Sequence, residues 1–164
     1  MIAVLDRGER IEYSFEDLMR YHGPSAPGGV AHAVKVMERA WPELDGAGAP
    51  ERREIGIRTA FGGPGARDAF EMVTRAVSED RYVVDPELAR AELGRVRERF
   101  VFALSYRDRS VTLQVREGFV TEEFIDLARK EPRNADEEGR LTQLKREMAE
   151  RVMAASAADV YEPA

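Results

Sequence analysis

Two short loops rich in glycine and proline contain most of the residues of this sequence that could do chemistry. One runs from Gly23 to Gly29 and the other from Gly62 to Gly65, and each precedes a predicted helix. Amide groups at the start of a helix have no partner within it and attract anions, and glycine lets a ligand approach the backbone. The loops are therefore candidate anion-binding elements. Alternatively, they only turn the chain, and Ser25 or Asp68 caps a helix.

His22 lies beside the first loop, and Asp68 follows the second. Histidine can act as a general acid or base, or it could bind a metal weakly together with Asp68. The alternative is a structural histidine whose ring donates a hydrogen bond that closes its loop. A zinc site needs three or four ligands, and no such spacing is found, so no metal site is predicted. Neither loop matches a nucleotide or dinucleotide fingerprint, so the sequence identifies no cofactor.

The composition excludes several classes of function. The chain has 164 residues, no cysteine and a net charge of −6. Without cysteine there are no disulfides, thiolate metal sites or cysteine nucleophiles. Negative charge opposes nucleic-acid binding, and mixed runs such as Arg95 to Arg99 are typical of a solvated surface. No apolar run is long enough to span a membrane and the N-terminus lacks a signal-peptide pattern, so we expect a cytoplasmic protein without membrane contact.

The first half of the chain predicts a hairpin and two helices. Residues 2–5 and 11–13 flank a turn, and Ser14 is a helix cap for a short helix that follows. Apolar residues from Val30 to Trp41 recur at helical spacing, and Pro42 is expected to end that second helix.

The remainder of the chain predicts alternating strands and helices. The expected strands are 55–59, 81–84, 100–106 and 111–115, and the expected helices are 66–77, 86–96, 122–130 and 136–158. The last helix carries an apolar stripe consisting of Leu141, Leu144, Met148, Val152 and Ala155. The stripe could pack on its own domain or on a second copy of the chain, which would give a homodimer.

Two motifs resemble those of a known family. The run from Ser14 to Gly23, followed by Ala26-Pro27-Gly28, resembles the opening motif of the FmdE domain of formylmethanofuran dehydrogenase, which ends in His-Gly-His-x-Cys-Pro-Gly. The run from Gly65 to Phe70 is similar to that family's Cys-x-x-Asp-Ala-Ile. Pro24 replaces the second histidine, and Ala26 and Gly65 replace the cysteines. The zinc ribbon of the family is absent, so its thiol-dependent metal chemistry cannot operate here.

The resemblance implies an α+β fold with a mixed or antiparallel sheet and helices packed on one face. The implied order is an α-β-α-β-β-β core over about residues 14–117 and a C-terminal helical extension over about 121–160, within one domain of 1–164. It also implies that the two loops converge on a small polar pocket. The residues expected to bind a ligand there are His22, Gly23, Ser25, Pro27, Gly28, Arg58, Arg67 and Asp68.

Three functions are consistent with these features. The first is a divergent FmdE-like domain that binds a small polar molecule or anion between the two loops. The second is a non-catalytic, dimeric accessory protein that docks a partner through its last helix. The third is a hydrolase or isomerase that uses His22 and Asp68 without any cysteine. The sequence leaves open whether the protein is an enzyme.

Overall fold

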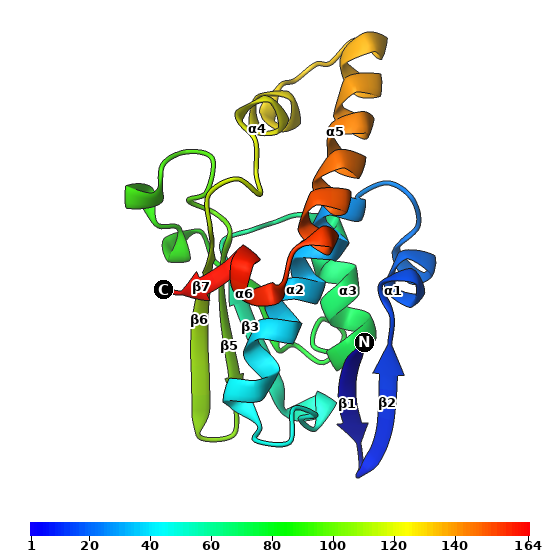
Figure 1. Ribbon diagram of the computed structural model, residues 1–164, viewed down its shortest axis with the longest axis vertical. Coiled ribbons are helices and arrows are strands. Elements are labelled where there is room, and N and C mark those ends of the chain that lie inside the picture. The colour runs from blue at the N-terminus through cyan, green and yellow to red at the C-terminus, as the bar shows by residue number, and fades with distance from the viewer.

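A five-stranded sheet with helices packed across one face forms the centre of the computed structural model, which describes residues 1–164 (Figure 1). The strand order is β4, β3, β5, β6, β7, with bounds Tyr82–Val84, Ile55–Thr59, Val101–Tyr106, Arg109–Val115 and Tyr161–Pro163. Only β3 and β4 are parallel, and the other neighbours are antiparallel. The predicted α+β class with a mixed sheet is confirmed.

Six helices and an N-terminal hairpin complete the fold. The helices are α1 (Phe15–His22), α2 (Pro27–Leu44), α3 (Pro64–Thr74), α4 (Glu122–Arg129), α5 (Ala135–Ala154) and α6 (Ala157–Val160). The hairpin consists of β1 (Ile2–Asp6) and β2 (Glu9–Tyr13), and 3-10 turns span Arg52–Glu54, Pro86–Leu88 and Ala91–Leu93. The order α2, β3, α3, β4, β5, β6 is the α-β-α-β-β-β order that we expected.

Alternation along the strands decides which face of the sheet is covered. Phe102, Leu104 and Tyr106 of β5 are buried, whereas Ser105 between them is exposed. The buried set packs beneath α2 and α3 in one cluster of 33 residues. Because residues from α5, α6 and β7 belong to the same cluster, the C-terminal extension shares the core of the rest of the chain.

Pro42 does not end the second helix as predicted. α2 continues to Leu44, and the amide of Asp45 donates to the carbonyl of Trp41 at 2.9 Å. Proline removes one backbone hydrogen bond and its ring crowds the carbonyl four residues earlier, so a proline beyond the first turn disfavours a helix locally. Trp41 and Leu44 are both buried, and their packing favours the additional turn.

The prediction of a helix over residues 86–96 is also wrong, because this segment contains two 3-10 turns instead. None of the residues in these turns is buried, so a helix here would have no apolar face to pack. Gly94 has a φ of 85°, which a helix cannot accommodate. The segment instead forms a loop that returns the chain to β5.

The boundaries of two further helices differ from the prediction. α3 begins at Pro64 rather than Ala66, and it ends at Thr74 because Arg75 adopts a left-handed conformation with a φ of 60°. α5 ends at Ala154, and residues up to 158 do not continue it. The chain then forms the short helix α6 and the strand β7. Val160 at the end of α6 and Tyr161 at the start of β7 are fully buried.

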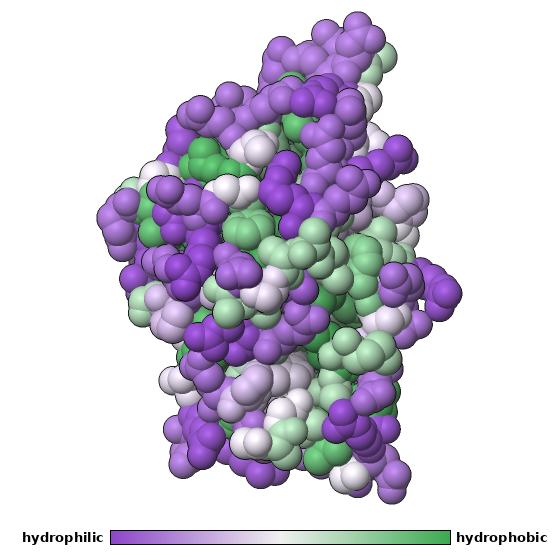
Figure 2. Space-filling model, in the orientation of Figure 1, coloured by the Kyte–Doolittle hydropathy of each residue, from purple (hydrophilic) through white to green (hydrophobic).

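The apolar stripe of the last helix packs inside its own chain. Leu141, Leu144, Met148 and Val152 are all at most 5% exposed, and α5 lies along α2. The outward surface of α5 is hydrophilic, which Figure 2 shows as purple along the helix. The stripe is therefore not available to a second copy or a partner. The homodimer and the docking of a partner were both predicted from this surface, which is buried inside the chain.

The cap predicted at Ser14 is confirmed as a capping box. The Ser14 hydroxyl accepts from the amide of Asp17 at 3.1 Å, and the Asp17 carboxylate accepts from the amide of Ser14 at 2.9 Å. These hydrogen bonds with Ser14 lower the pKa of the Asp17 carboxyl.

We expect Ser14→Ala to lower the free energy of unfolding by about 1 kcal/mol, because it leaves a first-turn amide without its acceptor. Urea unfolding followed by circular dichroism measures this change. Thr142→Ala is the control, since it removes an exposed hydroxyl from the interior of α5. Equal stability of the two variants would contradict the role of the cap.

None of the helices combines the length and the apolar composition that crossing a membrane requires.

Candidate functional site

The two glycine loops meet in space, as expected. A Cβ atom placed on Gly65 would lie 2.3 Å from the carbonyl oxygen of Ala26, and one on Gly29 would lie 3.0 Å from the amide nitrogen of Ala66. The first turns of α2 and α3 are therefore in backbone contact. Gly29 and Gly65 are therefore required for the two loops to approach each other. This role is separate from the access that glycine gives to a ligand.

His22 connects the two loops through hydrogen bonds. Its Nδ1 lies 2.8 Å from Oδ2 of Asp68 at the start of α3, and its Nε2 lies 3.3 Å from the hydroxyl oxygen of Ser25. The His22 side chain is only 4% exposed, whereas Ser25 lies at the surface. Arg67 flanks this chain of groups, with its guanidinium 3.6 Å from the second oxygen of Asp68.

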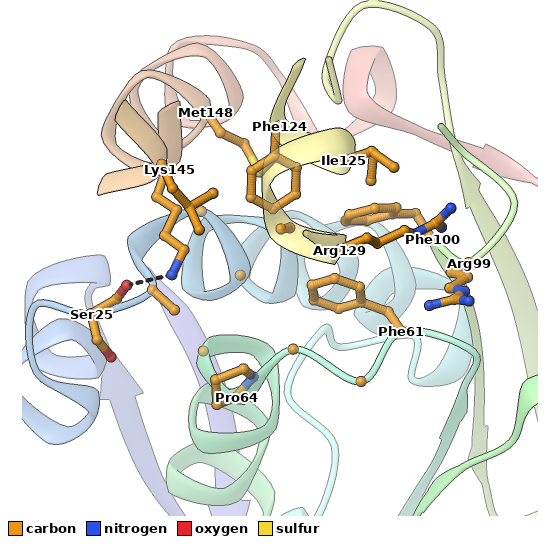
Figure 3. Close-up of a pocket in the computed structure, with 18 of the residues that line it drawn as sticks. Ser25, Phe61, Pro64, Arg99, Phe100, Phe124, Ile125, Arg129, Lys145 and Met148 are labelled. Carbon is orange, nitrogen blue, oxygen red and sulfur yellow. Dashed lines mark hydrogen bonds between the residues drawn. The ribbon is translucent and has the colours of Figure 1, made fainter. Parts of the chain in front are cut away.

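A cavity of about 630 Å³ opens beside the junction of the loops, and we call it the loop pocket (Figure 3). The glycines of both loops form one side. Phe61 and Phe100 form an apolar wall with ring centroids 4.4 Å apart, and Phe124 of α4 lies across from them. The size and the aromatic walls suit a small organic molecule.

Charge in the loop pocket has one sign. Its 20 lining residues include Arg99, Arg129, Arg133 and Lys145 and no aspartate or glutamate. This is the reverse of the chain as a whole, which carries a net charge of −6. A positive lining in an otherwise acidic protein favours anions at this place.

Two of the four cations have no carboxylate partner. Arg129 lies 3.8 Å from Glu98, and Arg133 pairs with Glu138 at 2.9 Å. Arg99 and Lys145 make no ion pair, and Lys145 donates only to the backbone carbonyl of Ser25 at 3.3 Å. In Figure 3 these two side chains lie on opposite sides of the aromatic wall. Their charges are available to a ligand.

The N-termini of α2 and α3, beside the loop pocket, also lack capping side chains. No side chain caps α2 or α3 at its N-terminus. The other four helices are all capped, by Ser14, Thr121, Asn134 and Ser156. Uncapped first turns leave amide donors and the positive end of the helix dipole unneutralised. The alternative in which Ser25 or Asp68 caps one of these helices is therefore wrong.

Only some of the residues predicted for the site lie together. Ser25 and Gly28 line the loop pocket, and His22, Asp68 and Arg67 form the adjoining polar chain. The remaining three have other positions. Gly23 caps the C-terminus of α1 with a φ of 89°, Pro27 is the first residue of α2, and Arg58 bonds Asp85 away from the pocket.

Sequence reasoning missed most of the pocket lining. Arg99 stands in a mixed-charge run that is typical of a solvated surface, and Lys145 is one of many charges on α5. The distinguishing property of both is the absence of an ion-pair partner, which has no signature in the sequence. Phe61 and Phe100 are predicted only as parts of a loop and a strand, although together they form the apolar wall.

No group of three or more histidine, aspartate or glutamate side chains is arranged to hold a metal ion. Among known proteins, the chain matches no family model and no curated protein.

Proposed function

We propose that this protein is a divergent FmdE-like domain that binds a small organic anion with an apolar body in the loop pocket. The observation that carries the proposal is a cavity whose lining holds four cations and no acid. The uncapped ends of α2 and α3 supply further donors for an anion. The stacked pair Phe61 and Phe100 supplies the surface for the apolar body.

The position of Lys145 supports this proposal most directly. An ammonium group without a carboxylate usually extends into water, because hydration stabilises it. Here the side chain turns toward the loop and is only partly exposed, and its single partner is the neutral carbonyl of Ser25. A bound anion would replace the missing counter-charge.

The test is a calorimetric titration with three matched probes. Phenyl phosphate has both a charge and an aromatic ring, inorganic phosphate has only the charge, and phenol has only the ring. We expect phenyl phosphate to bind at least tenfold more tightly than either of the others, because it alone engages both the cations and the aromatic wall. Comparable affinity of phenol and phenyl phosphate would overturn the proposal.

Substituting the unpaired cations should weaken phenyl phosphate binding. We expect Arg99→Gln and Lys145→Gln each to raise its Kd about tenfold, the size of one charge-assisted hydrogen bond. Arg107→Gln is the control, since its guanidinium pairs with Glu54 at 2.9 Å on the far hairpin turn. An equal effect of the control would show that only the net charge of the protein matters.

A further inference from the structure

Ser25, His22 and Asp68 are connected in the order nucleophile, base and orienting acid. The Ser25 hydroxyl oxygen is 3.3 Å from Nε2 of His22, and Nδ1 of His22 is 2.8 Å from Asp68. Each of the two ring nitrogens of His22 therefore has its own hydrogen-bond partner. Unrelated hydrolases share this connectivity on different folds, and it is recognised by geometry rather than by sequence order.

The Asp68 contact determines the tautomer of His22. An ionised carboxylate can only accept hydrogen bonds, so Nδ1 of His22 must carry the proton that it shares with Asp68. In the neutral ring Nε2 is then an acceptor and faces the Ser25 hydroxyl. Asp68 therefore holds the ring in the state in which it can take a proton from Ser25.

The surroundings separate the base from solvent but leave the nucleophile accessible. The His22 side chain is 4% exposed, whereas Ser25 is exposed at the edge of the loop pocket. The ammonium group of Lys145 donates to the backbone carbonyl of Ser25 (Figure 3). The amides of Gly28 and Gly29, in the uncapped first turn of α2, lie three and four residues further on.

We infer that these three residues form a catalytic triad that hydrolyses carboxylic esters whose body carries an anionic group. Ser25 Oγ bonds to the acyl carbon as its proton passes to Nε2 of His22. The bond between the acyl carbon and the ester oxygen breaks, and that oxygen leaves with the electron pair and takes the proton from His22. Water then adds to the acyl-serine by the same route, which releases the carboxylic acid and restores Ser25.

The inference rests on the proposed function only for recognition of the anionic group. The proton transfer depends on the triad alone, whereas Lys145 and the aromatic wall select the ester. Two probes can therefore be chosen so that failure of the triad and failure of the anion pocket are seen separately.

The first probe is a small neutral fluorophosphonate, which labels activated serines without needing the anion pocket. Intact-mass and peptide mass spectrometry should show one adduct on Ser25, absent in Ser25→Ala and retained in Ser105→Ala, which removes an exposed strand serine. Asp68→Asn keeps the shape of the side chain and should slow labelling about 100-fold or more. Absence of a Ser25 adduct in the wild type, or equal labelling rates in Asp68→Asn, would overturn the inference.

The second probe is para-acetoxybenzoate, an anionic aryl acetate, compared with its neutral methyl ester. Release of the phenol is followed by absorbance. We expect the anionic ester to be preferred and Lys145→Gln to remove that preference. Labelling of Ser25 without a preference for the anionic ester would retain the triad and count against the anion pocket. If Asp68→Asn does not fold, loss of ester hydrolysis in Ser25→Ala decides the role of Ser25.

Discussion

Gly65→Ala is expected to lower the free energy of unfolding by about 3 kcal/mol, the upper end of the usual cost of overpacking. The new Cβ would lie 2.3 Å from the carbonyl oxygen of Ala26 and 3.0 Å from the amide nitrogen of Val30. Both are backbone atoms, so neither can rotate away. The first turns of α2 and α3 would have to separate.

The direction of the stability change in Gly65→Ala distinguishes helix propensity from the contact between the loops. Gly65 lies in the first turn of α3, and within helices alanine is more favourable than glycine by about 1 kcal/mol. Local propensity alone therefore predicts stabilisation, and only the contact with Ala26 predicts the opposite. Chemical unfolding of the variant distinguishes the two.

Gly62→Ala is the matched control from the same loop. The nearest atom to its Cβ would be Cγ1 of Val84 at 4.0 Å, and its φ is not positive. We expect a change within about 1 kcal/mol, in the stabilising direction, from the reduced entropy of the unfolded chain. A Gly65→Ala variant as stable as Gly62→Ala would show that the two loops are not in backbone contact.

His32 is expected to make the protein progressively less stable as the pH falls from about 6.5 toward 3. The ring is fully buried in α2, where Nδ1 lies 2.9 Å from the Tyr161 hydroxyl and the ring of Phe100 packs 4.9 Å away. Burial, with a smaller contribution from the charge of Arg151, lowers the pKa of His32 from 6.5 to about 3. The folded protein therefore resists protonation of this residue.

The sign follows from comparing the two states. Above pH 6.5 the ring is neutral in both, so His32 contributes no pH dependence. Between pH 6.5 and about 3 the unfolded chain binds a proton that the folded protein excludes, which costs about 1.4 kcal/mol per pH unit. At pH 5 the free energy of unfolding should therefore be about 2 kcal/mol lower than at pH 7 from this residue alone.

Urea unfolding of wild type and His32→Gln at pH 7, 6 and 5 measures this contribution. The difference in stability between the two proteins should change with pH, because the variant lacks the titrating ring. Parallel curves would contradict the prediction. Should His32→Gln not fold, NMR titration of the wild type gives the answer, since the His32 ring should remain neutral at pH 4.

Local patterns were sufficient for most of the secondary structure. The hairpin turn, the cap at Ser14 and the alternation from Phe100 to Tyr106 each depend on neighbouring residues only, and each has the predicted structure. Pro42 does not end its helix because its local cost is offset by the burial of Trp41 and Leu44. The segment after Ala154 does not continue the predicted helix, because its last residues pair with the edge of β6 as the antiparallel strand β7.

The sequence alone determined most of the helices and strands and the two glycine loops, because glycine, proline and apolar periodicity act through local geometry. Only the tertiary structure decided which charges stand unpaired around the loop pocket and that Ser25, His22 and Asp68 form one hydrogen-bonded chain. Asp68 is 46 residues from His22, and Lys145 is 120 residues from Ser25. Contacts over such separations depend on how α2, α3 and α5 pack, and no local pattern encodes them.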